Sequence, residues 1–108
     1  MAIRAHIQAG ACGLETVVHA TCADGLSVAL QVESSCPKVQ AMAGALRTLN
    51  AFEEVLLGPL VRTTPAQMAA QHRLHASCPV PIGLLKAVEA AAGLALATPC
   101  EIRLDQDK

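Results

Sequence analysis

The stretch that decides the fold is DGLSVALQVE, residues 24–33. Asp24-Gly25 is a strong signal for a tight β-hairpin, because glycine adopts the positive φ values that such turns need. The residues after this pair alternate between apolar and polar, which predicts a strand with one buried face. Its apolar positions are Leu26, Val28, Leu30 and Val32.

Two further strands precede this hairpin. Ile3, Ala5 and Ile7 alternate with polar neighbours, and a Thr- and Val-rich segment runs from about residue 15 to 22. Both patterns predict strands, and residues 10–13 predict the turn between them. The first third of the chain is therefore expected to form a three-stranded meander.

After Cys36-Pro37 the apolar period changes from two to 3.6, which is typical of helices. The first helix carries its apolar face on Val39, Met42, Ala43 and Leu46. Three further helical segments are expected. The first is short, around residues 52–58, and the second runs from about Pro65 to His72 with Thr64 as its N-cap. The last helix starts at Cys78-Pro79 and ends at Gly93, which is its C′ residue.

A final strand is expected after Pro99, because Cys100, Ile102 and Leu104 alternate with charged residues. The main elements then follow the order β-β-β-α-α-α-β. We predict an α+β fold in which helices pack on one face of a four-stranded mixed sheet. One domain is expected over residues 1–108.

The composition narrows the class of protein. The chain is 53% hydrophobic with one aromatic residue, Phe52, so its core consists of small aliphatic side chains. The excess of such residues around Gly93 predicts self-association, as a dimer or trimer. The formal net charge is −1, and no basic stripe or aromatic platform indicates a nucleic-acid partner.

No membrane partner is expected either. The longest apolar stretch, residues 87–97, contains Glu89 and two glycines and is too short to span a bilayer. The first six residues lack the apolar core of a signal peptide. We therefore expect a cytoplasmic protein, in which five cysteines are not a disulfide framework.

Two cysteines stand where helices are predicted to begin, in Cys36-Pro37 and in Cys78-Pro79-Val80-Pro81. Proline is favoured at the first helical position, because its missing N–H has no helical partner there anyway. Each cysteine is therefore predicted at or near an N-cap, where free N–H groups and the helix dipole favour a thiolate.

Strand directions sort the five cysteines into two groups. Cys12 lies in the first predicted turn, and Cys36 follows the third strand, which ends at the same end of the sheet. Cys78 joins them if the last helix begins at that end. Cys22 and Cys100 belong to the opposite end, on the apolar side of their strands, and we expect both in the core.

Three thiolates from Cys12, Cys36 and Cys78 suit zinc, Cu(I) or an iron–sulfur cluster that needs a fourth ligand. His75 stands three residues before Cys78 and is the candidate fourth ligand or general base. The alternatives are that His75 is a polar residue in a helix connection, and that one or more of the cysteines is an incidental cap or core residue.

Cys78-Pro79-Val80-Pro81 and the apolar helix after it resemble the Cys-Pro-x-Pro element of the TusA/SirA sulfur-carrier family. In that family the cysteine at the helix N-terminus carries a persulfide, so the resemblance implies a carrier role for Cys78. The rest of the chain departs from the family, whose motif follows the first strand.

The three cysteine segments together are similar to a small prokaryotic family that is common in anaerobes and has no assigned activity. These segments are Gly10-Ala11-Cys12-Gly13, Ser35-Cys36-Pro37 and residues 75–81. This resemblance spans the chain and implies that the three cysteines form one site.

The sequence thus predicts a small metal- or iron–sulfur-binding protein that acts in electron transfer, cluster delivery or sensing. One alternative is a sulfur-transfer protein with Cys78 as acceptor and Cys12 or Cys36 as the resolving thiol. Another is an oligomeric domain with structural cysteines only. A redox or sulfur-transfer protein is the expected partner. No phosphate-binding glycine loop, Ser/His/Asp set or carboxylate pair indicates a conventional enzyme.

Overall fold

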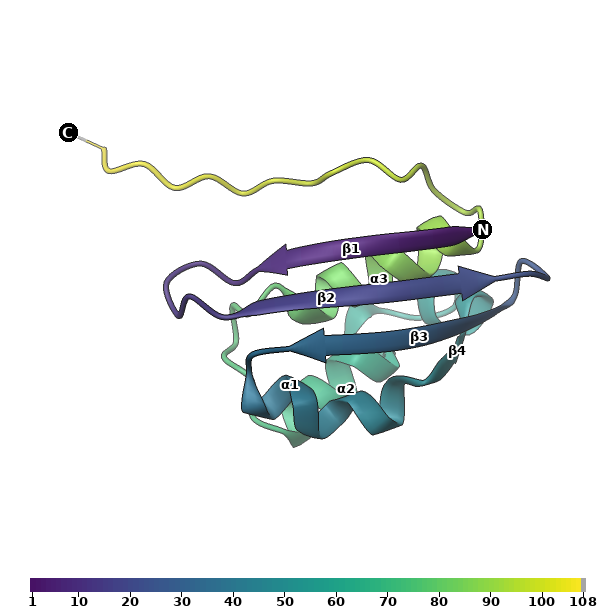
Figure 1. The fold of residues 1–108 in the computed structure, drawn as a ribbon, viewed down its shortest axis with the longest axis horizontal. Coiled ribbons are helices and arrows are strands. Elements are labelled where there is room, and N and C mark those ends of the chain that lie inside the picture. The colour runs from purple at the N-terminus through teal and green to yellow at the C-terminus, as the bar shows by residue number, and fades with distance from the viewer. Residues whose placement is uncertain (108) are drawn as a thin grey trace.

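The computed structural model has four strands and several helices, which confirms the α+β class (Figure 1). It describes residues 1–107, so that Lys108 of the expected domain lies outside it. The strands are β1 (Ala2–Gln8), β2 (Glu15–Cys22), β3 (Ser27–Ser34) and β4 (Thr48–Asn50). The α-helices are α1 (Pro37–Met42), α2 (Thr64–Gln71) and α3 (Val80–Ala91), with short helical turns η1 (Ala43–Leu46), η2 (Phe52–Leu56) and η3 (Leu60–Arg62).

The sheet has the order β1-β2-β3-β4. Its first three strands form the predicted meander, in which Ala2 pairs with Thr21 and Thr16 pairs with Ser34. Every neighbouring pair of strands is antiparallel, so the sheet is purely antiparallel and not the mixed sheet that was predicted.

The fourth strand is also not the predicted one. We expected it after Pro99, but residues 92–107 contain no strand. The fourth strand is β4, which pairs with the start of β3. With three residues, β4 is too short to show an alternation of apolar and polar side chains. The residues after Pro99 do alternate, but such a segment forms a strand only where it can hydrogen-bond to the edge of a sheet.

The turn between β2 and β3 is held by one carboxylate. Asp24 Oδ1 accepts hydrogen bonds from the backbone N–H groups of Leu26 and Ser27, each at 2.9 Å, and Gly25 has φ +74°. These two backbone hydrogen bonds lower the pKa of Asp24 below its ordinary value, because they stabilise the charged form. The turn thus owes its shape to Gly25 and its anchoring to Asp24.

The helices begin and end close to the predicted positions. In the α1 and η1 segment Val39, Met42 and Leu46 are fully buried, as their spacing predicted. Thr63, and not Thr64, is the N-cap of α2, and its side chain accepts a hydrogen bond from the N–H of Ala66 at 3.3 Å.

The C-terminus of α3 follows the predicted pattern. Gly93 has φ +77°. The N–H of Leu94 bonds the carbonyl of Glu89 at 2.9 Å, and the N–H of Gly93 bonds the carbonyl of Ala90 at 3.1 Å. This is a Schellman motif, in which glycine at C′ avoids steric strain.

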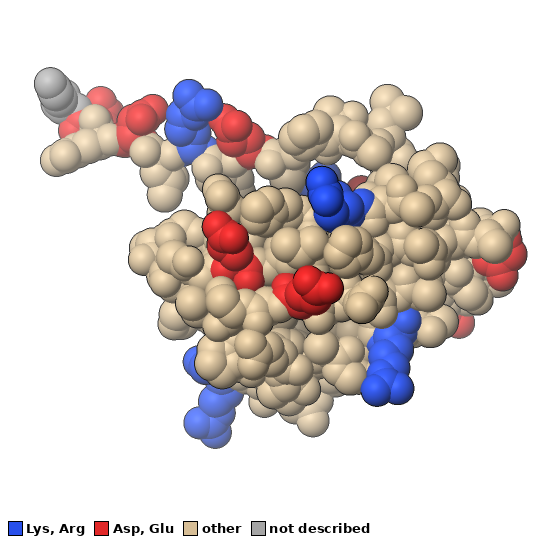
Figure 2. Space-filling view, in the orientation of Figure 1, with Lys and Arg blue, Asp and Glu red and all other residues tan. Residues whose placement is uncertain are grey.

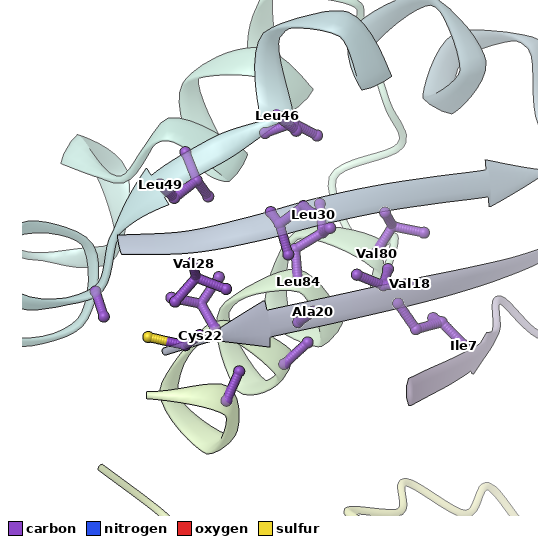
Figure 3. Close-up of a cluster of buried hydrophobic side chains, with 14 of the residues drawn as sticks. Ile7, Val18, Ala20, Cys22, Val28, Leu30, Leu46, Leu49, Val80 and Leu84 are labelled. Atoms are coloured by element: carbon purple, nitrogen blue, oxygen red, sulfur yellow. The ribbon is translucent and has the colours of Figure 1, made fainter. Parts of the chain in front are cut away.

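The core lies between the sheet and α3, which crosses behind β1 and β2 in Figure 1. Val18 on β2 and Leu84 on α3 are fully buried (Figure 3). Gly83 lets the helix approach β1 very closely, since a Cβ built there would lie 2.3 Å from Cδ1 of Ile7. A glycine in the middle of α3 is thus explained by helix–strand packing.

The other face of the sheet is uncovered by helices. It carries alternate residues of β1 to β3, which are exposed or half-buried: Arg4, His6, Gln8, Val17, His19, Gln31 and Glu33. Figure 2 shows charged side chains of both signs scattered over this side, without a continuous basic or acidic band. Over residues 1–107, no helix has the length and apolar character needed to cross a bilayer.

Candidate functional site

Three cysteine-bearing loops lie at one end of the sheet, which we call the cysteine end. They are the turn between β1 and β2, the link from β3 to α1, and the link from α2 to α3 (Figure 1). Hydrogen bonds tie the second loop to β2, because Ser35 donates its N–H to the carbonyl of Glu15 at 3.0 Å. Lys38 Nζ donates to the carbonyl of Arg73 at 2.9 Å and thereby joins α1 to the third loop.

Cys12 occupies the tip of the β1–β2 turn. The N–H of Gly13 bonds the carbonyl of Gly10 at 2.9 Å, and both glycines have positive φ, at +71° and +90°. The side chain of Cys12 is exposed. A hollow of about 170 Å³ lies beside this turn, lined by residues 8–10 and 13–15. Cys12 is therefore accessible to solvent and to a macromolecular partner.

Cys36 is the N-cap of α1, as predicted, with extended φ and ψ of −85° and 119° and Pro37 directly after it. Its N–H donates to Ser34 Oγ at 3.0 Å. The thiol does not hydrogen-bond to the helix, and the half-buried side chain packs against the core. Its position thus combines partial burial with a helix start.

Cys78 lies one residue before the N-cap of α3, which is Pro79. The N–H of Cys78 bonds the carbonyl of His75 at 3.0 Å, which closes a tight turn. Its half-buried side chain packs against the core, and Val80, two residues later, is only 2% exposed. Cys78 is therefore anchored on both sides and lies next to the N-cap, within the predicted range, while Pro79 occupies the N-cap itself.

The first turn of α3 offers few backbone donors. No side chain caps it, and Pro81 has no N–H. The N–H groups of Val80 and Ile82 are the donors that the helix itself does not bond at this end. The Cys-Pro-x-Pro spacing thus leaves two free amides next to the Cys78 loop.

His75 and the three cysteines do not form a ready-made metal site. His75 is exposed, and its backbone carbonyl, not its ring, makes the contact with Cys78. Within residues 1–107, no group of three or more His, Cys, Asp or Glu side chains is arranged so that it could hold one metal ion.

The remaining two cysteines differ from each other. Cys22 is 7% exposed and belongs to the core, as predicted, with its thiol donating to Asp24 Oδ1 at 3.6 Å. Cys100 is exposed, so its predicted core position is wrong. The reason is the missing strand after Pro99, because only a paired strand would have turned Cys100 towards the helices.

An apolar groove on another side of the molecule was not predicted. It has a volume of about 260 Å³ and lies between α3 and the η2–η3 segment. Its apolar lining includes Val55, Leu60, Ile82 and Leu85, and its charged lining is Glu54, Lys86 and Glu89. Of the apolar residues on either side of Gly58-Pro59 (Leu56, Leu57, Leu60 and Val61), Leu60 alone lines the groove, so no local sequence pattern indicated it.

Comparison with known families adds one decisive observation. Residues 3–104 match a family described as a family of unknown function, DUF6951. The chain belongs to this family. The DUF6951 match includes the whole cysteine end and the C-terminal segment as far as Leu104, and it agrees with the expected resemblance to an uncharacterised small family. Comparison with curated proteins and with solved structures gave no match.

Proposed function

We propose that this DUF6951 protein is a sulfur-transfer protein in which Cys78 accepts and releases a sulfane sulfur. The observation that carries the proposal is the placement of Cys78. It is half-buried, closed into a turn by its own N–H and followed by the core residue Val80. A sulfur carrier needs one thiol in a fixed position that a donor protein and then an acceptor can reach. It does not need several side chains that converge on one metal ion.

The chemistry requires only thiols. The Cys78 thiolate attacks the outer sulfur of a donor persulfide, the donor S–S bond breaks, and the donor leaves as a thiolate. Cys78 then carries the new S–S bond as its own persulfide. An acceptor nucleophile then attacks the outer sulfur, the S–S bond of Cys78 breaks, and Cys78 is released as a thiolate. No oxidant is consumed.

Free N–H groups near the Cys78 loop support this chemistry. The Val80 and Ile82 amides and the positive end of the α3 dipole favour a negative charge at this helix start. The resemblance of residues 78–81 to the Cys-Pro-x-Pro element of sulfur carriers points the same way. Thiols that stay reduced suit a cytoplasmic location, which is part of this proposal.

Metal binding by the cysteine end is the second candidate. The observation that favours it is the position of the Cys12, Cys36 and Cys78 loops at the same end of the sheet (Figure 1). With His75 as the fourth ligand, these residues would hold zinc or an iron–sulfur cluster once their side chains converge. The function would then be electron transfer, cluster delivery or sensing.

Anaerobic purification, followed by metal and sulfide analysis and intact-protein mass measurement, separates these candidates. We expect a colourless protein that gains the mass of one sulfur atom when treated with a persulfide donor. Cys78→Ser should abolish this gain, whereas Cys100→Ser, which removes an exposed thiol of the C-terminal segment, should leave it unchanged.

Two results would overturn sulfur transfer. Stoichiometric metal or visible absorbance that is lost in Cys12→Ser, Cys36→Ser and Cys78→Ser would establish the metal site instead. Protein with neither metal nor a persulfide on Cys78 would leave the cysteines as structural residues.

A further inference from the structure

The C-terminal segment, residues 99–105, has the pattern of a strand but pairs with no strand within residues 1–107. Ile102 and Leu104 are 85% and 90% exposed, although burial of such apolar side chains is a main source of folding stability. Figure 1 shows the segment extended along the β1 side of the sheet, and no residue from 92 to 107 is in a strand. Its apolar row is therefore uncovered.

This segment belongs to the domain that the family shares. The DUF6951 match runs from residue 3 to residue 104, and the alternation of apolar side chains also ends at Leu104. A chance extension beyond the domain would have no reason to be included. The strand-like pattern thus lies inside the part of the chain that matches the family.

The sheet offers one long free edge, which is β1. Met1 and Cys22 exchange hydrogen bonds, and the N–H of Ala9 bonds the carbonyl of Leu14. In an antiparallel ladder the bonded residues alternate, so the odd-numbered residues of β1 bond β2. The N–H and C=O groups of the even-numbered residues, Arg4 and His6 among them, point to the free edge, where a further strand could bond them.

Side chains of the edge and of the segment are complementary. Residues 1–10 contain Arg4 and His6 but no acidic residue, whereas residues 99–107 contain three acidic residues and one arginine. If Ile102 and Leu104 continue the row that Ile7 begins on the helix-covered face, Glu101, Arg103 and Asp105 fall on the open face. Glu101 and Arg103 already pair with each other at 2.7 Å, and Asp105 then faces Arg4. Apolar pattern and charge therefore match together.

We propose that two copies of this chain exchange their C-terminal segments, each docking residues 99–105 as a fifth strand on β1 of the other copy. Within one copy the segment runs in the same direction as β1 (Figure 1), so pairing there would be parallel. A second copy allows the antiparallel arrangement, which is the more stable one. The antiparallel register that sets Asp105 opposite Arg4 also sets Ile102 opposite Ile7.

Light scattering on the full chain at tens of micromolar protein tests this exchange. His6→Pro removes an edge N–H without removing a bond to β2, and His6→Ala is its matched control because it keeps that N–H. Wild type and His6→Ala should be dimers, and His6→Pro should be a monomer. The full-length double variant Ile102→Asp/Leu104→Asp changes only exposed side chains and should also be a monomer.

Hydrogen exchange on the same proteins locates the docked segment. Amides of residues 100–105 should be protected in wild type and unprotected in His6→Pro, while β2 and β3 stay protected in both. A monomeric wild type would overturn the proposal. This holds even if residues 100–105 are protected, because they would then pair with β1 of the same copy. Dimers that survive both the His6→Pro and the double substitution would place the interface elsewhere and overturn it equally.

Discussion

At the scale of single residues, Gly83 leaves no room for a side chain between α3 and Ile7. A Cβ at Gly83 would meet Cδ1 and Cγ1 of Ile7 at 2.3 and 2.6 Å. We expect Gly83→Ala to lower the free energy of unfolding by up to about 2 kcal/mol, because an overpacking cost of about 1–3 kcal/mol is only partly offset by a gain in helix propensity of about 1 kcal/mol. Urea unfolding measures this difference.

Two variants control the Gly83 prediction. Gly44→Ala should be neutral or slightly stabilising, since nothing lies within 4 Å of its added Cβ. Ile7→Ala removes both clashing atoms, so the double variant Gly83→Ala/Ile7→Ala should be more stable than the sum of the single effects predicts. If the two effects on the free energy of unfolding were strictly additive, the contact with Ile7 would not be the cause of the Gly83→Ala effect.

At the scale of elements, the β2–β3 hairpin depends on the charge of Asp24. Backbone hydrogen bonds lower its pKa below the ordinary 3.8 in the folded protein. Because the folded pKa is the lower one, the charge stabilises the hairpin above pH 3.8, and this stabilisation is lost as the pH falls through the folded pKa.

The test of the hairpin compares wild type with Asp24→Asn, which keeps the side-chain oxygen but removes the charge. At neutral pH the urea midpoint of wild type should be the higher one, and the difference should disappear at pH values below the folded pKa. Other carboxylates titrate in both proteins and cancel in the difference. A midpoint difference that did not change with pH would contradict a role of the charge.

At the scale of the whole molecule, the fold sorts the five thiols by exposure. Cys12 and Cys100 are exposed, Cys36 and Cys78 are half-buried, and Cys22 is buried. If solvent exposure alone set the rate of alkylation, iodoacetamide would label Cys12 and Cys100 first. If the start of α3 activates its neighbouring thiol as proposed, Cys78 should react faster than Cys100 in spite of its lower exposure.

Alkylation near pH 7 followed by peptide mass analysis gives these rates. Cys22 serves as the internal control and should react last, after unfolding. Labelling that simply followed exposure would argue against an activated thiol at Cys78.

Local patterns in the sequence determined a large part of this structure. The period-two runs and the glycine turns predicted β1 to β3, because side-chain alternation and positive φ are properties of a few adjacent residues. The 3.6 period likewise predicted the buried face of Val39, Met42 and Leu46, and Gly93 predicted the end of α3. The proline after Cys36 correctly placed this cysteine at a helix N-cap.

Only the tertiary structure decided which segments pair and which side chains meet. β4 became the fourth strand because it reaches the open edge of β3, whereas the better strand pattern after Pro99 pairs with no strand in the described part of the chain, residues 1–107. The exposure of Cys100 follows directly from that difference. The Gly83–Ile7 contact also joins residues far apart in the sequence, and the physical reason is the same: pairing and close packing depend on surfaces that exist only after the chain has folded.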